Sequence, residues 1–166
     1  MTDIISEARI AAMIAERKEM SEDWRQELAN LKNRVGRHET EVDLTGTGGT
    51  PFRILISLRH SSPENFTVIL MLNSPTHPNF PLLRYDGGSH DHRNRLEGNR
   101  IIRRPHIHRA TERYQIATYQ RRPDGYAEET KRYQDLAGAW DCFRSDANLA
   151  FPDDDASRLL PPPFTR

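Results

Sequence analysis

The sequence predicts an α+β protein: an antiparallel sheet of four to six strands, with an N-terminal helical arm and a C-terminal helix packed on one face. Two observations support this fold class. Apolar and polar residues alternate in two matched runs, 52–58 and 66–72, which a short polar link joins. Apolar residues recur at helical spacing near both ends of the chain. Two alternating runs around a short link favour an antiparallel hairpin.

The N-terminal stretch 4–32 is expected to be helical, in two pieces. Ser21 has the properties of an N-cap, and acidic residues follow it in the first turn, where the helix dipole favours them. Trp24, Leu28 and Leu31 continue one apolar face, and Gly36 is expected to end the helix. This segment is best interpreted as a packing or dimerisation helix, which makes a homodimer through the N-terminal helices one expected assembly.

Further strands are expected beside the hairpin. Residues 37–44 alternate, residues 82–85 form a short apolar-aromatic run, and residues 114–119 are a candidate for one more strand. The strongest helical pattern is 130–143, where Trp140 and Phe143 share one apolar face. A face of this kind normally covers a sheet, so both aromatic side chains are expected to be buried against the hairpin.

The length of 166 residues suits one domain. We expect three segments: an arm (1–36), an α+β core (37–145) and an acidic, proline-rich tail (146–166). No apolar run approaches the roughly 18 residues that span a bilayer, and the N-terminus lacks the features of a signal peptide. Cys142 is the only cysteine, which excludes an internal disulfide. A cytoplasmic location and no membrane partner are therefore expected.

Positive charge and imidazoles are concentrated in segment 82–113. Four of the seven histidines lie there, with eight arginines against only four acidic residues, although the whole chain is neutral. The arginines expected to bind nucleic acid are Arg93, Arg95, Arg100, Arg103, Arg104 and Arg109. Such a concentration is typical of a site that handles a polyanion.

Two chemistries can be built from the histidines. Residues i and i+2 of a strand face the same side, so His106 and His108 can present two imidazoles together, as can His90 and His92. Two such pairs would supply the four nitrogen ligands of a zinc site. The surrounding arginines disfavour a dication, and structural zinc usually recruits cysteine, so no metal and no cofactor are expected.

The second chemistry is metal-independent RNA cleavage through the 2′-hydroxyl. Histidines suit the roles of base and acid because their pKa lies near neutral pH, and arginines stabilise the crowded phosphate. Tyr85 is a candidate base partner or stacking platform, and Asp86 is a candidate to orient an imidazole. A basic edge that binds a polyanion without chemistry is the remaining alternative.

These residues also carry a resemblance. The order Arg84-Tyr85-Asp86, then His90 and His92, then Pro105-His106-Ile107-His108 resembles the TumE-type toxins of bacterial toxin–antitoxin loci and related mobile-element proteins. The resemblance covers roughly residues 52–143. It implies a toxin-like endoribonuclease, encoded beside a small DNA-binding antitoxin. The matching candidate catalytic residues are Arg84, Tyr85, Asp86, His92, His106 and His108.

The chain departs from the toxin pattern in a longer N-terminal arm, a longer arginine loop and an added acidic-proline tail. We therefore expect an RNA-directed endoribonuclease of toxin type, with RNA and a small antitoxin as partners. The alternative is a non-enzymatic binding or inhibitor protein, related to phage or to phage defence, that acts on a nucleic-acid-handling partner. In that case the arm and Asp153, Asp154 and Asp155 of the tail would be its contact surfaces.

Overall fold

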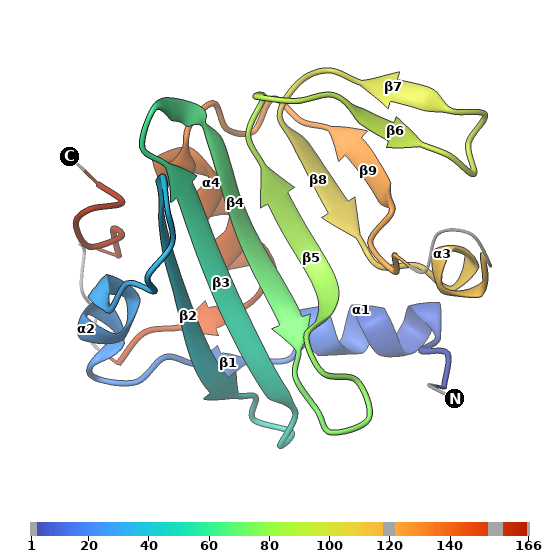
Figure 1. The fold of residues 1–166 in the computed structure, drawn as a ribbon. Helices are drawn as coiled ribbons and strands as arrows, with labels where there is room; N and C mark the ends of the chain where they lie inside the picture. Colours follow the sequence, from blue (N-terminus) through green and yellow to red (C-terminus); the bar gives the residue numbers. More distant parts are fainter. Residues whose placement is uncertain (1–2, 118–121, 153–157, 166) are drawn as a thin grey trace.

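A computed structural model describes residues 3–117, 122–152 and 158–165 of the chain. Its centre is a six-stranded antiparallel sheet with the strand order β2-β3-β4-β5-β8-β9 (Figure 1). Helices pack around this sheet, so the predicted α+β class and the predicted number of strands are confirmed.

Four strands follow one another in the sheet as they do in the sequence. They are β2 (Arg37–Thr45), β3 (Pro51–Arg59), β4 (Ser62–Leu72) and β5 (Phe80–Asp86). The register pairs Ile54 with Leu70 and Ile56 with Val68, so the apolar residues of the predicted hairpin share one face. The alternation in the sequence was therefore sufficient to place these strands.

The last two strands of the sheet do not follow β5 directly in the sequence. Strand β8 (His106–Arg109) pairs with β5, and β9 (Tyr126–Glu129) pairs with β8 at the edge. Between β5 and β8 the chain forms a separate two-stranded ribbon, β6 (His92–Asn94) and β7 (Arg100–Ile102). Figure 1 shows this ribbon beside β8 and β9, away from the β2 edge of the sheet.

The N-terminal residues belong to the same hydrophobic core as the sheet. Helix α1 (Glu7–Ala15) begins after Ser6, whose side chain accepts a hydrogen bond from the Arg9 backbone N–H, and it buries Ile10 and Met13. A short strand β1 (Lys18–Glu19) follows and pairs in parallel with β10 (Leu149–Ala150). Ile10 and Met13 therefore pack within the core of the chain itself, and a homodimer through the N-terminal helices stays a prediction.

Two details of the predicted N-terminal helices are wrong. Helix α2 (Trp24–Ala29) has Asp23 as its N-cap residue, and Ser21 instead accepts a hydrogen bond from the Asp23 backbone N–H. The helix ends before Leu31, which is exposed. The Lys32 backbone N–H already donates to the Glu39 carbonyl, so the chain has turned back to the sheet before it reaches Gly36.

Helix α4 (Leu136–Asp146) packs against β4 and β5. It begins later than the predicted residue 130, because the Asp135 side chain caps it by accepting from the Gly138 backbone N–H at 2.8 Å. Trp140 and Phe143 are almost completely buried, which confirms their predicted place in the core. Their helix covers the sheet face that carries Tyr85, whose ring centroid lies 5.6 Å from that of Phe143.

Two other expectations concern residues that follow the histidine segment. The predicted strand 114–119 is wrong where the structure describes it, because helix α3 (Glu112–Ile116) forms there, capped by Thr111. The acidic residues Asp153, Asp154 and Asp155 lie outside the described residues. Within the described parts of the chain, no helix combines the length and the apolar character needed to cross a membrane.

Candidate functional site

The register between β5 and β8 gathers the candidate site on one face of the sheet. Asp86 pairs with His106, and Arg84 pairs with His108. Since side chains alternate along a strand, these four point to the same side. Tyr85 and its partner Ile107 point to the opposite side, toward α4. The strand pairing therefore builds the site from residues about 20 positions apart.

The β6–β7 ribbon covers this face. Asn94 of β6 is fixed to Ala127 of β9 by two hydrogen bonds: its amide nitrogen donates to the Ala127 carbonyl at 2.7 Å, and its amide oxygen accepts from the Ala127 N–H at 2.9 Å. Ala127 is the register partner of His108, so the ribbon lies over the histidines. His92, two residues before Asn94 on β6, faces the same side.

Three imidazole rings converge beneath the ribbon. The ring centroids of His92 and His108 are 4.4 Å apart, and those of His106 and His108 are 4.9 Å apart. One ring nitrogen from each of the three lies within 4.8 Å of the other two. His106 and His108 are 0% and 1% exposed, whereas His92 is half-buried. The predicted meeting of His92 with the two strand histidines is therefore seen in the structure.

Backbone carbonyls determine which nitrogen of each ring carries a proton. Nδ1 of His106 lies 2.8 Å from the Arg104 carbonyl oxygen, and Nδ1 of His108 lies 2.7 Å from that of Asp124. For His92 the nitrogen so placed is Nε2, 2.8 Å from the Gly125 carbonyl oxygen. A carbonyl oxygen can only accept, so these three nitrogens donate. In the neutral rings, the other nitrogen of each carries a lone pair.

Asp86 lies at the base of this cluster and is 2% exposed. Its Oδ1 accepts a hydrogen bond from the Thr67 hydroxyl at 2.6 Å, while its Oδ2 lies 3.3 Å from His108 Nε2 and 3.5 Å from His106 Nε2. Burial raises the pKa of Asp86, whereas the Arg84 charge lowers it, and hydrogen bonds from His106 and His108 lower it well below its usual range when their Nε2 atoms carry protons. The Arg84 charge favours the carboxylate form in either state of the rings.

Arg84 is occupied by a partner of its own. Its guanidinium forms an ion pair with the buried carboxylate of Asp124, on the loop before β9. The Arg84 side chain is only 18% exposed, so it is not placed to receive a phosphate from solvent. Instead it supplies positive charge behind Asp86 and fixes the loop whose carbonyls orient His92 and His108.

The structure separates Tyr85 from the predicted site. Its hydroxyl donates to Asp146 of α4 on the far face of the sheet, and burial, followed by the contact with Asp146, raises its pKa far above the ordinary value. A base or stacking role beside the histidines is therefore wrong for Tyr85. Tyr133 supports the site from that face, because its hydroxyl donates to the backbone carbonyls of Asp86 and His106.

His90 and the arginines surround the cluster on the solvent side. His90 is exposed, with its ring centroid 5.3 Å from that of His106 and its Nε2 4.0 Å from Asp86 Oδ2. Exposed arginines lie on or beside the ribbon: Arg93, Arg95, Arg100, Arg103 and Arg104. Arg109 shares the face of Ile107 and lines a cavity with Tyr85 and Asp146, so it is separated from this group.

Four residues of the site were not anticipated: Thr67, Asn94, Asp124 and Gly125. The triplet Pro123-Asp124-Gly125 is typical of a tight turn. The turn brings two consecutive carbonyls to His108 and His92. Gly125 is required there, since a β-carbon would collide with the ring of Tyr114. Nothing local in the sequence indicates the partners of these four residues.

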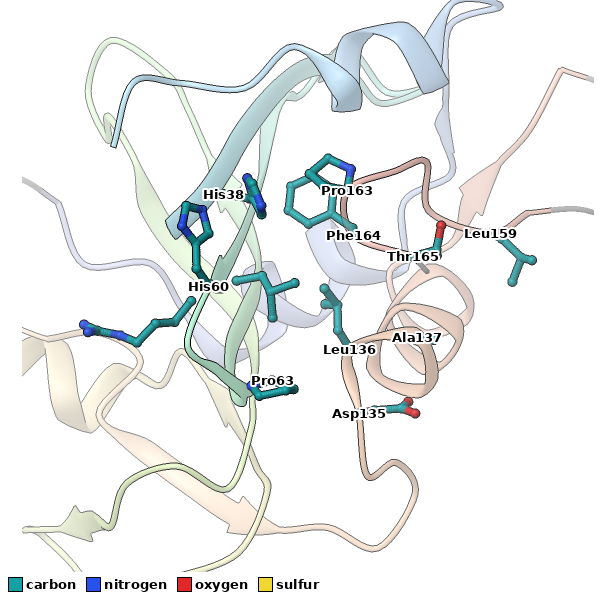
Figure 2. Close-up of a pocket in the computed structure, with 12 residues that line it drawn as sticks. His38, His60, Pro63, Asp135, Leu136, Ala137, Leu159, Pro163, Phe164 and Thr165 are labelled. Atoms are coloured by element: carbon teal, nitrogen blue, oxygen red, sulfur yellow. The ribbon is translucent and has the colours of Figure 1, made fainter. Parts of the chain in front are cut away.

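A cavity of about 540 Å³ lies elsewhere, between the start of α4, the β3–β4 turn and the C-terminal residues (Figure 2). Its lining includes His38 and His60, whose ring centroids are 4.1 Å apart, and Phe164. None of the residues of the histidine site lines it. This cavity is therefore separate from the place where the ionisable groups converge.

Comparisons of the chain with protein-family models, with curated proteins and with solved structures found no match. The site is therefore interpreted from its own residues and their geometry.

The Thr67 hydroxyl should stabilise the fold through Asp86. Replacing Thr67 by Val removes a hydrogen bond to a buried carboxylate, so we expect the free energy of unfolding to fall by about 1.5–3 kcal/mol. Thr67→Ser, which keeps the hydroxyl, is the matched control. Urea denaturation measures both variants. Equal stability of the Val and Ser variants would show that the hydroxyl contributes nothing.

Proposed function

We propose that the chain is an RNA-directed protein of endoribonuclease type. The observation that carries this proposal is the convergence of Asp86, His92, His106 and His108 directly beneath a ribbon that bears exposed arginines. Arginine binds phosphate through its forked donors, and imidazoles move protons near neutral pH. The two chemistries needed to hold and cleave a phosphodiester therefore lie side by side.

Burial divides the roles among the histidines. His106 and His108 are enclosed, with one nitrogen of each held by a carbonyl, so in the described structure neither ring reaches a phosphate from solvent. The exposed His90 and the half-buried His92 can contact a bound substrate. In this proposal His90 and His92 act at the phosphate and 2′-hydroxyl, while His106, His108 and Asp86 are positioning residues.

The resemblance of the motifs to TumE-type toxins supports the same function. It suggests a small antitoxin as a protein partner, and the cytoplasm as the place where both RNA and partner are met. The single cysteine, Cys142, is unpaired, which fits a reducing compartment. The alternative of a non-enzymatic binding protein requires only the exposed charge, so it predicts RNA or protein binding without cleavage.

The ribbon arginines should carry the electrostatic part of RNA binding. Each phosphate contact to a single strand contributes about 0.7 to the slope of log affinity against log salt, so replacing Arg100, Arg103 and Arg104 by Gln should reduce the slope by up to about 2. The matched control replaces Arg17, Arg34 and Arg59, which are also exposed but lie outside the ribbon. Equal slopes for both triple variants would place the RNA elsewhere.

Cleavage itself tests the enzymatic part of the proposal. The purified full chain should cut single-stranded RNA and leave a 2′,3′-cyclic phosphate, since the 2′-hydroxyl is the nucleophile. His90→Ala and His92→Ala should each lower the rate about 100-fold or more, the scale of a lost acid or base. The double variant His38→Ala, His60→Ala removes a remote histidine pair and should retain the rate. RNA binding without any cleavage would instead support the non-enzymatic alternative.

A further inference from the structure

We propose that His92, His106 and His108, with the carboxylate of Asp86 beside them, bind one divalent transition-metal ion of the zinc class. This inference reverses the preference drawn from the sequence, which was for a site without metal. It goes beyond the proposed function and does not depend on it: a bound ion would occupy His92, so the role of His92 in RNA cleavage applies to the metal-free chain.

The first step is the direction of the lone pairs. Because Nδ1 of His106 and of His108 each donate to a carbonyl, the Nε2 atoms of the neutral rings present lone pairs toward Asp86 Oδ2, at 3.5 and 3.3 Å. Among the described residues, His106 Nε2 is buried and meets no hydrogen-bond partner. Two lone pairs facing a carboxylate inside a protein are unfavourable unless a cation lies among them.

Protonation of His106 and His108 at Nε2 is the alternative way to satisfy these lone pairs. It would create two imidazolium groups beside the Arg84 guanidinium, giving three buried positive charges against the two carboxylates of Asp86 and Asp124. A metal ion satisfies the same lone pairs while the rings remain neutral, and it can also use His92, one ring nitrogen of which lies within 4.8 Å of a ring nitrogen of His106 and of His108. The third ring distinguishes a metal site from a simple buried ion pair.

The second step is geometry. Two nitrogens bound tetrahedrally to one zinc ion at about 2.0–2.1 Å lie about 3.4 Å apart. The three histidine nitrogens lie within 4.8 Å of one another, so they need to approach by at most about 1.4 Å to share an ion. Imidazole nitrogens suit zinc and its neighbours in the first transition row, and they are poor ligands for magnesium or calcium.

The third step is the support around the ligands. Metal-binding histidines characteristically donate their second nitrogen to a carbonyl or carboxylate, which fixes the tautomer and the ring orientation. All three rings do so here, to the carbonyls of Arg104, Asp124 and Gly125. Asp86 is held in the same way, since its Oδ1 accepts from Thr67 and its Oδ2 is left to face the cluster.

The charge objection raised by the sequence is met by the structure. Arg84 lies across β5 and β8 beside the cluster, and Asp124 neutralises it, while Arg122, whose charge also acts on His92, is exposed. The arginines of the ribbon are exposed, and Arg103 has Asp91 at 3.9 Å. Water screens such exposed charges strongly, so they oppose a buried dication only weakly. As ligands of an ion, the three imidazoles would be neutral and Asp86 would supply one negative charge.

Metal binding to the full chain tests this proposal. After removal of metal with a chelator, titration with Zn²⁺ should show one ion per chain, and Co²⁺ should produce visible absorption bands typical of nitrogen ligation. His106→Ala and His108→Ala should each weaken Zn²⁺ binding about 100-fold or more, because losing a ligand costs at least as much as losing its outer-shell support. The His38→Ala, His60→Ala double variant is the matched control and should bind normally.

A variant that fails to fold would also lose metal binding, so a second measurement uses the wild-type chain. Zn²⁺ should raise the melting temperature of the metal-free wild-type chain, because a ligand that binds only the folded state stabilises it. Two results would overturn the proposal: no stoichiometric Zn²⁺ or Co²⁺ binding by the wild-type chain, or binding that survives His106→Ala and is lost in the His38/His60 variant. RNA cleavage is not used as a readout, so failure of the nuclease proposal leaves this test intact.

Discussion

The site depends on the register between β5 and β8. Antiparallel pairing sets Asp86 opposite His106 and Arg84 opposite His108, and strand alternation sends all four side chains to one face. A slip of one residue would turn both imidazoles toward α4 and bring Ile107 to the site. The register is itself fixed from the other face, where Tyr133 donates to the carbonyls of Asp86 and His106. The contacts that hold the register on the core face therefore also set the geometry of the site.

Hydrogen bonds and ion pairs offset the free-energy cost of burying so many polar groups. Asp124 neutralises Arg84 through its side chain while its carbonyl orients His108, so one turn residue serves both the charge and the geometry. Asn94 fixes the ribbon over the cluster by bonding both backbone groups of Ala127. Unpaired buried polar groups cost about 1–3 kcal/mol each, and such costs explain why most polar atoms here have partners. Arg84 Nε and His106 Nε2 are the two exceptions among the described residues.

The fold was predictable where local pattern determines structure. Alternation in 52–58 and 66–72 placed the central hairpin, and helical spacing placed Trp140 and Phe143 in the core. Strand spacing alone predicted that His106 and His108 face the same side of their strand. Tyr85 was misassigned because residues 84, 85 and 86 were grouped by their order in a motif. Alternation along the strand puts Tyr85 on the opposite face.

What sequence could not supply were contacts between distant segments. The carbonyls of Asp124 and Gly125 reach His108 and His92 from 16 and 33 residues away, and no local pattern encodes these partners. The expectation of a metal-free site rested on counting arginines, but their effect depends on where they lie. Only the structure shows that Arg84 is neutralised and that the ribbon arginines face solvent.

The central claim is that backbone carbonyls fix the tautomers, so that the Nε2 lone pairs of His106 and His108 face Asp86. Long-range ¹H–¹⁵N correlation spectra of the histidine rings, recorded on the metal-free full chain at neutral pH, test this claim directly. The account predicts neutral rings protonated at Nδ1 in His106 and His108 and at Nε2 in His92. Rings of His106 and His108 that carry protons on both nitrogens, or on Nε2 alone, would contradict it.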